Sequence, residues 1–352
     1  MQQNLMKKTA VSFLLFFVFA MSSILYLSAG KVITITDVAQ DEVAEAKNLK
    51  TEAQEGQENS LTFVLGEADT SYLRIPLPEG CKAENIIIEN HYMDRQLWLM
   101  IQGAEESFYA ENAISGNRKM IKEGTYDEEE EGVKLNLQLN GIYECRTILE
   151  DNNLYISFLS PREVYDKIVV IDPACGSVEG GYVDNGLREK DINLQIARKL
   201  KEKLDGSDIK AYYTRMDDVN PSAQDRVLLG NDTRADMYIR IQVNYSEDTS
   251  VYGTSTVYNG DYFIPGFGSV ELADALEREV VTAVKGKALG LIEATQEDEV
   301  IKNATVPAAA ICVGYISNAQ EETLLGREEY IDKIASGIYE AILQSYEEKG
   351  GQ

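Results

Sequence analysis

Histidine is almost absent from this sequence: His91 is the single one among 352 residues. Imidazole is the commonest metal ligand in proteins and the usual general base near neutral pH. The chain therefore cannot form a zinc site with two histidine ligands. Positive charge is also scarce, since 33 Lys and Arg residues stand against 59 Asp and Glu residues, for a net charge of −26. Such acidity argues against nucleic acid as a partner and disfavours peripheral binding to anionic lipid.

One long apolar run, residues 9–29, carries no charge and follows Lys7 and Lys8. Its 21 residues are enough to cross a bilayer as a helix. The lysines before it predict a cytoplasmic N-terminus, residues 1–8, and an extracytoplasmic body. A cleaved signal peptide that ends near Ala29 is the alternative, although the run is long for one. We expect a single-pass protein of the cell membrane.

The next two segments differ in composition. Residues 30–60 are polar and acidic and predict a flexible stalk. Residues 61–162 contain short β-like runs separated by Gly, Asn, Asp and Pro, and residues 134–140 ("KLNLQLN") alternate between apolar and polar. This pattern predicts a small antiparallel β domain, a sandwich by strand count.

From 165 to 349 the patterns of strands and helices alternate along the chain. We expect strands at 167–172, 209–215, 237–244 and 308–317, and helices at 191–204, 222–231, 268–284 and 328–347. This alternation predicts an α/β domain whose mostly parallel sheet is flanked by helices on both faces. Functional residues in such folds gather at the carboxyl ends of strands, where Cys175, Gln242 and Cys312 are expected.

Five blocks between 167 and 346 resemble the zinc-dependent N-acetylmuramoyl-L-alanine amidases, which cut the bond between the glycan and the stem peptide of peptidoglycan. In chain order they are "IVVIDPACGS", "NGLREKDINLQIARKLKEKL", "YYTRMDDVNPSAQDRVLLGN", "ADMYIRIQVN" and "VPAAAICVGYISNAQEETLL". The resemblance covers about half of the chain and implies the fold of that family's catalytic domain.

In this family a His, a Glu and a second His bind zinc, and a Glu on the last strand is the general base. These positions correspond to Cys175, Glu189, Gln242 and Cys312, so only Glu189 is retained. An amide is a weak zinc ligand, and losing a general base typically costs about 10²–10⁴ in rate. The resemblance therefore implies an amidase-like protein without bound zinc or hydrolytic activity, which binds peptidoglycan or a cell-envelope protein.

Other uses of these residues stay open. Cys175, Glu189 and Cys312 form a mixed sulfur and oxygen set that zinc tolerates, which would give an active amidase with a rebuilt site. Alternatively the thiols stay free, or they form disulfides outside the membrane, Cys175–Cys312 and Cys81–Cys145 if they pair by domain. A purely protein-interacting ectodomain is a further alternative. The oligomeric state stays open.

Five further residues match family positions, and we expect structural roles for them: Asp172, Arg215, Arg226, Asn244 and Asn318. Arg226 is predicted to pair with an acidic neighbour, and Asp172 and Asn244 to bond the loops that follow their strands. Glu189 is predicted to be a buried or half-buried carboxylate near a helix N-terminus, where the helix dipole favours its charge.

Overall fold

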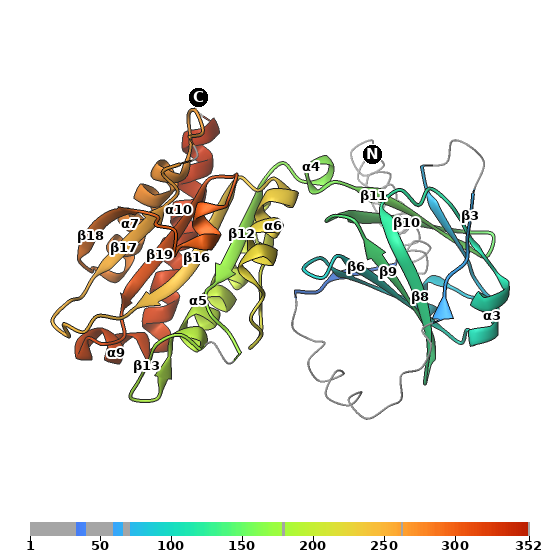
Figure 1. Ribbon diagram of the computed structural model, residues 1–352, viewed down its shortest axis with the longest axis horizontal. Helices are drawn as coiled ribbons and strands as arrows, with labels where there is room; N and C mark the ends of the chain where they lie inside the picture. The colour runs from blue at the N-terminus through green and yellow to red at the C-terminus, as the bar shows by residue number, and fades with distance from the viewer. Residues whose placement is uncertain (1–32, 40–58, 66–70, 178–179, 262, 351–352) are drawn as a thin grey trace, which may run out of the picture.

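The computed structural model describes residues 33–39, 59–65, 71–177, 180–261 and 263–350. The predicted membrane anchor, residues 9–29, lies outside these residues, as does most of the predicted stalk. Within the described part, no helix has the length and apolar character needed to cross a bilayer. Figure 1 shows a β-rich part followed by an α/β part, with the short helix α4 between them.

The β-rich part contains two sheets that share one core. Their strand orders are β1-β5-β6-β9-β8-β2 and β10-β11-β4-β7-β3. Leu97, Leu99 and Ile101 alternate along β6 and pack with Ile75 of β4 and Leu154 of β11 in the same buried cluster. The elements are β1 (Ile35–Asp37), β2 (Asn59–Ser60), β3 (Phe63–Leu65), β4 (Leu73–Pro76), η1 (Ala83–Asn85), β5 (Ile86–His91), β6 (Gln96–Gln102), α3 (Glu106–Glu111), β7 (Ile114–Gly116), β8 (Ile121–Glu129), β9 (Gly132–Leu139), β10 (Glu144–Glu150) and β11 (Asn153–Leu159).

Two features of this part differ from the sequence-based expectation. The pairs β1–β5 and β3–β7 are parallel, so the sheets are mixed rather than purely antiparallel. Moreover, Ile35–Asp37 forms a strand inside the range predicted as stalk, and Ile33 and Val38 beside it are buried. The acidic composition of residues 30–60 as a whole masked a short apolar segment that completes a sheet edge.

The α/β part is built on a six-stranded sheet with the order β15-β12-β16-β19-β17-β18. The first four strands in this order run parallel, β17 is antiparallel to β19, and β18 is parallel to β17. The predicted mostly parallel sheet is therefore confirmed, but β17 and β18 were not predicted. β17 has the polar sequence TSTVY although it is mostly buried, and β18 is a largely exposed edge strand, so neither shows clear alternation.

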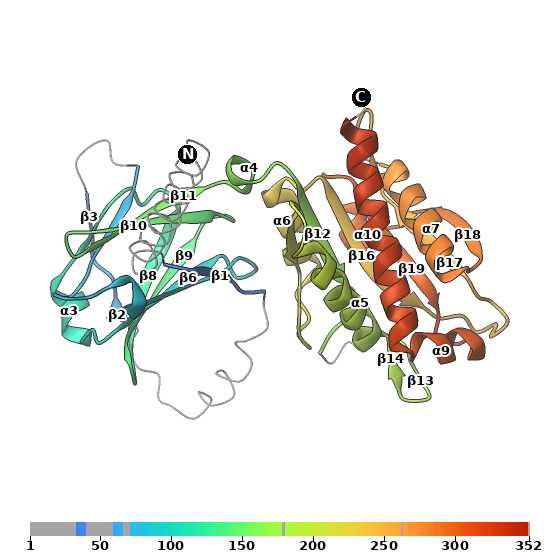
Figure 2. The ribbon, with the colours of Figure 1, turned by 180° about the vertical axis from the view of Figure 1, so that it is seen from behind.

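Helices cover both faces of this sheet, as Figures 1 and 2 show. On one face α5, α7 and α10 pack against strand residues such as Ile171 and Ile239, and on the other α6 and α8 pack against Val170 and Tyr238. Neighbouring strand residues thus face opposite helix layers, as the pleat requires. Cys312 belongs to the layer with α6 and α8.

The elements of the α/β part are α4 (Pro161–Val164), β12 (Ile168–Pro173), β13 (Val183–Asp184), β14 (Leu187–Arg188), α5 (Glu189–Leu204), β15 (Lys210–Tyr213), α6 (Ala223–Thr233), β16 (Met237–Asn244), β17 (Thr254–Tyr258), α7 (Ser269–Val284), β18 (Ala288–Glu293), α8 (Glu299–Lys302), β19 (Ala308–Tyr315), α9 (Ala319–Leu325) and α10 (Glu328–Gly350). Side-chain caps fix where two of the helices begin. The Ser222 hydroxyl accepts from the third amide of its helix, and the Asn318 side chain accepts from two amides of α9.

Candidate functional site

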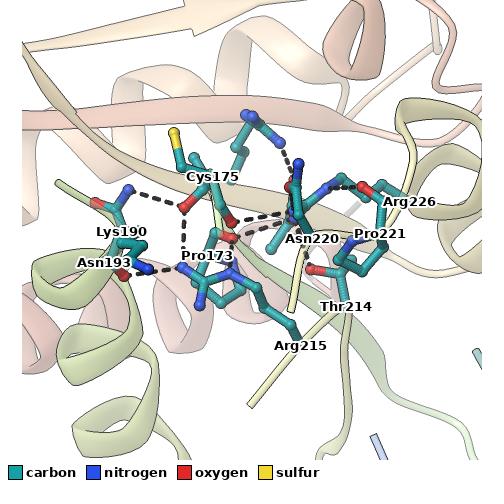
Figure 3. Close-up of polar contacts among 12 residues, drawn as sticks. Pro173, Cys175, Lys190, Asn193, Thr214, Arg215, Asn220, Pro221 and Arg226 are labelled. Carbon is teal, nitrogen blue, oxygen red and sulfur yellow. Dashed lines mark hydrogen bonds and ion pairs between the residues drawn. The ribbon is translucent and has the colours of Figure 1, made fainter. Parts of the chain in front are cut away.

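The loop after β12 carries the first predicted site residue. Cys175 has a φ of 61° and Gly176 a φ of 151°. A Cβ atom on Gly176 would lie 2.0 Å from the carbonyl oxygen of Val219, so the loop can pass this carbonyl only at a glycine. In Figure 3 the Cys175 sulfur lies on the far side of its own backbone from the Arg215 guanidinium group. The thiol therefore faces away from Arg215.

Two buried arginines hold this loop by its carbonyl groups (Figure 3). Arg215 donates to the carbonyl oxygens of Pro173, at 2.9 Å, and Ala174, at 3.0 Å. Arg226 donates to the carbonyl oxygen of Cys175 at 3.2 Å. The structural roles predicted for both arginines are confirmed, because each one donates to carbonyl groups of the loop.

Asp172 is the fully buried acid at the centre of this support. Its carboxylate accepts from Arg226, from Arg240 and, at 2.6 Å, from the Thr214 hydroxyl. Burial alone would raise the pKa of Asp172, but the guanidinium groups of Arg226 and Arg240 outweigh it and hold that pKa well below its usual range. The predicted pairing of Arg226 with an acidic neighbour is therefore confirmed, and the neighbour is Asp172.

Glu189 is the first residue of α5 and lies at the base of a short hairpin. Strands β13 and β14 are joined by Asn185 and Gly186, whose φ values of 44° and 89° suit a tight hairpin turn. The amide of Tyr182 donates to Glu189 Oε2 at 3.1 Å, and the amide of Glu189 donates to the carbonyl oxygen of Tyr182 at 2.9 Å. The Glu189 carboxylate thus closes the hairpin.

Gly181 separates Glu189 from Cys175. A Cβ atom there would lie 2.3 Å from Glu189 Oε2 and 2.9 Å from Cys175 Sγ. Burial and the nearby Glu189 charge raise the pKa of Cys175 to about 11. Burial also raises the pKa of Glu189 above its ordinary value, so the charge-favouring effect predicted from the helix N-terminus is outweighed.

Gln242 and Cys312 are neighbours across the β16–β19 ladder. The Gln242 amide nitrogen donates to Cys312 Sγ at 3.0 Å. Burial raises the pKa of Cys312 to about 11, and the Glu189 charge adds to this shift. Because the Glu189 charge acts on both Cys175 and Cys312, the structure brings the four predicted positions around one site.

The residues at these positions do not fit a zinc ion. Within the described part of the chain, no group of three or more His, Cys, Asp or Glu side chains is arranged to hold a metal. The side-chain amide nitrogen of Gln242 points toward Cys312. This nitrogen is a hydrogen-bond donor and has no lone pair available for a metal. The rebuilt site of Cys175, Glu189 and Cys312, considered from the sequence, is therefore not assembled.

The predicted disulfides are also absent. All four cysteines of the chain lie within the described residues, and all four are free thiols. Neither Cys175–Cys312 nor Cys81–Cys145 is bonded. The pairing by domain fails at the altered site because Cys312 is bonded to Gln242, whereas Cys175 packs beside Gly181.

Thiol titration checks this arrangement. Denatured protein should yield four thiols per chain, the same number with and without prior reduction, because the four cysteines are free. In the folded protein, Cys175 and Cys312 should react slowly with a disulfide reagent at neutral pH, because a pKa of about 11 leaves little thiolate. Their reaction rate should rise as the pH is increased toward that value. Thiols that appear only after reduction would contradict the structure.

A cavity of about 250 Å³ opens beside this site. It is lined by Gln242 and Arg240 of β16, by Ala310 of β19, by Ala223, and by residues 297–301 at α8. The side of the sheet that carries the altered positions is therefore still open to a small ligand.

Residues 169–344, half of the chain, match the sequence profile of the N-acetylmuramoyl-L-alanine amidases of the Amidase_3 type. The chain belongs to this amidase family. The germination-specific N-acetylmuramoyl-L-alanine amidase of Bacillus subtilis (strain 168) is 34% identical over 199 residues, which span 52% of this chain and 81% of the relative. Uncharacterized protein YqiI of the same strain is 32% identical over 182 residues, 52% of this chain and 86% of the relative. An N-acetylmuramoyl-L-alanine amidase structure from Clostridium difficile 630 is 32% identical with a TM-score of 0.48, and the alignment covers 51% of this chain and 97% of that one.

Two supporting residues of this amidase-family domain were missed by the sequence analysis. Arg240 pairs with Asp172, and Lys190 is buried and bonds the carboxylate of Asp218 and, at 2.9 Å, the carbonyl oxygen of Ser177. One signal was present for Arg240: it lies two residues before Gln242 on β16 and hence on the same face of the sheet.

Proposed function

We propose that this protein is an amidase-family member that binds peptidoglycan through its cleft without hydrolysing it. The observation that carries the proposal is the hydrogen bond between Gln242 and Cys312. The resemblance places a zinc ligand and the general base at these two positions. An amide bonded to a protonated thiol supplies neither a metal ligand nor a carboxylate that takes a proton from water.

Binding is supported by what the cleft retains. The buried Asp172 network still holds the loop of Cys175, and Glu189 still closes its hairpin. The cavity beside Gln242 remains open. The loop and the hairpin thus keep their conformation although the hydrolytic groups have changed. This supports a role in binding peptidoglycan.

We further propose that residues 9–29 anchor the protein in the cell membrane and that its body is extracytoplasmic. The uncharged length of this run and the lysines before it support the proposal. An outer location would place the cleft next to peptidoglycan.

An activity assay on purified full-length protein tests the absence of hydrolysis. With insoluble peptidoglycan and added zinc, we expect stem-peptide release to be at least ~10⁴-fold slower than with an active family enzyme, because both the general base and the metal-activated water are missing. Zinc-stimulated release that disappears on chelation and in Glu189→Ala would overturn the proposal and favour the active alternative.

Co-sedimentation with the same insoluble peptidoglycan tests binding. We expect the full-length protein to pellet with the polymer at neutral pH and to stay in solution without it. A protein that stays in solution in both cases would favour the purely protein-interacting alternative.

A further inference from the structure

Tyr182 and Tyr245 form a stacked aromatic pair on the surface. Their ring centroids are 4.8 Å apart, and the ring planes differ by 17°. Nevertheless Tyr182 is 48% exposed and Tyr245 is 45% exposed. A contact that served only to join two loops would gain most by burying both rings, whereas this pair keeps much of its aromatic surface in solvent.

The pair lies beside the altered site. Tyr182 is bonded to Glu189 at the base of the hairpin, and a Cβ atom on its neighbour Gly181 would lie 2.9 Å from the Cys175 sulfur. Tyr245 directly follows the last residue of β16, the strand that carries Gln242. Both rings therefore stand at the carboxyl edge of the sheet, where α/β folds place their ligands.

The backbone on both sides of the stack is fixed. The two hydrogen bonds between Tyr182 and Glu189 hold the hairpin. Next to Tyr245, the carbonyl oxygen of Asn244 accepts from Ile316 at 2.9 Å, and the amide of Ser246 donates to the Ser317 hydroxyl at 3.0 Å. A platform that is already ordered loses little entropy when a ligand binds.

The chemistry of the pair fits a neutral sugar ring. A pyranose has a face of C–H groups that packs on an aromatic ring, and its hydroxyl groups can bond the phenol oxygens. Two adjoining tyrosines provide apolar area together with polar edges, which a carbohydrate requires and a purely apolar ligand does not.

We propose that Tyr182 and Tyr245 form a stacking platform for an N-acetylhexosamine ring of the glycan strand. This inference rests on the proposed function and specifies the part of the polymer that is held, the sugar rather than the stem peptide. Glu189 is a positioning residue in this arrangement, because its carboxylate accepts from Tyr182 and keeps the hairpin closed.

Calorimetric titration of full-length protein with a soluble oligomer of N-acetylglucosamine tests the platform. Tyr182→Ala and Tyr245→Ala should each weaken binding about tenfold, equivalent to about 1.4 kcal/mol, whereas Tyr245→Phe should stay within about twofold because the ring is kept. Tyr252→Ala is the matched control, since Tyr252 is also 48% exposed but contacts Lys287 rather than the stack. It should bind as the unaltered protein does.

Glu189 is tested with two variants. Glu189→Ala should weaken oligomer binding as much as Tyr182→Ala, and Glu189→Gln should restore it, because the amide oxygen still accepts from the Tyr182 backbone. The thermal unfolding midpoint of each variant separates this effect from a general loss of structure. Weak binding by Glu189→Gln with an unchanged midpoint would overturn the positioning role.

The two levels of the proposal fail differently. Protein that pellets with peptidoglycan but does not bind the oligomer, or binds it equally well in both alanine variants, overturns the platform and leaves the proposed function standing. Protein that binds the oligomer through the tyrosines but does not pellet with peptidoglycan overturns the proposed function and leaves the platform standing. Absence of both kinds of binding overturns both.

Discussion

Replacing Asp172 with alanine should lower the free energy of unfolding of the α/β part by about 3–5 kcal/mol. Asp172 is completely buried, and its carboxylate neutralises Arg226 and Arg240. Without it two guanidinium groups lose their counter-charge in a site from which water is excluded. The helical circular-dichroism signal during denaturant unfolding measures the effect, because nearly all helical residues in the described chain belong to this part.

Asp208→Ala provides the control for this prediction. Asp208 pairs with Lys167 at 2.9 Å, but its side chain is 77% exposed. Exposed ion pairs contribute little, so the loss should be much smaller than that caused by Asp172→Ala. Equal losses in the two variants would contradict the role assigned to Asp172.

Variants of Asp172 and Asp208 also test how the free energy of unfolding depends on pH. Since the pKa of Asp172 is depressed in the folded protein, its contribution is fully present above the unfolded value, about 3.9. This contribution to stability is lost as the pH falls from about 3.9 through the lower pKa that Asp172 has in the folded protein. Asp172→Asn should flatten this acid limb of the stability curve, whereas Asp208→Ala should largely keep it.

The alternation of strands and helices was enough to predict most of the α/β fold. The helix at 191–204 had apolar residues at helical spacing, and four strands had long apolar runs. The β17–β18 extension could not be predicted in this way, because its contacts come from antiparallel pairing with β19 rather than from its own side-chain pattern. For the same reason β1 was missed: pairing with β5 stabilises it, while the composition around it is acidic.

The positions of the candidate site were predictable, but their bonding was not. Family resemblance located Cys175, Glu189, Gln242 and Cys312, and the structure brings them together. The sequence left disulfides and free thiols open, and the structure has free thiols, because sequence does not reveal where a thiol points. The bond from Gln242 to Cys312 and the closure of the hairpin by Glu189 depend on side-chain directions that appear only in the folded chain.

The double variant Cys175→His/Gln242→His should acquire a zinc site. The two imidazoles would join Glu189, and a histidine tolerates the left-handed backbone of Cys175, where φ is 61°, better than most residues. The variant would have three good zinc ligands, two histidines and Glu189, where the unaltered protein has Glu189 alone. Its affinity for zinc should therefore be roughly thousandfold higher, equivalent to about 4 kcal/mol. Zinc per chain after washing with a weak chelator, together with calorimetry, measures the change.

A third substitution in this variant separates metal binding from catalysis. Adding Glu189→Ala should abolish the gained affinity, because it removes the carboxylate ligand. Adding Cys312→Glu instead should keep the zinc and supply a proton acceptor, so that stem-peptide release becomes detectable if the cleft still admits the polymer in the orientation needed for attack. Zinc binding as weak as in the unaltered protein would mean that the four positions do not converge as the structure places them, and the reading of this cleft as an amidase site without its metal and its base would then fail.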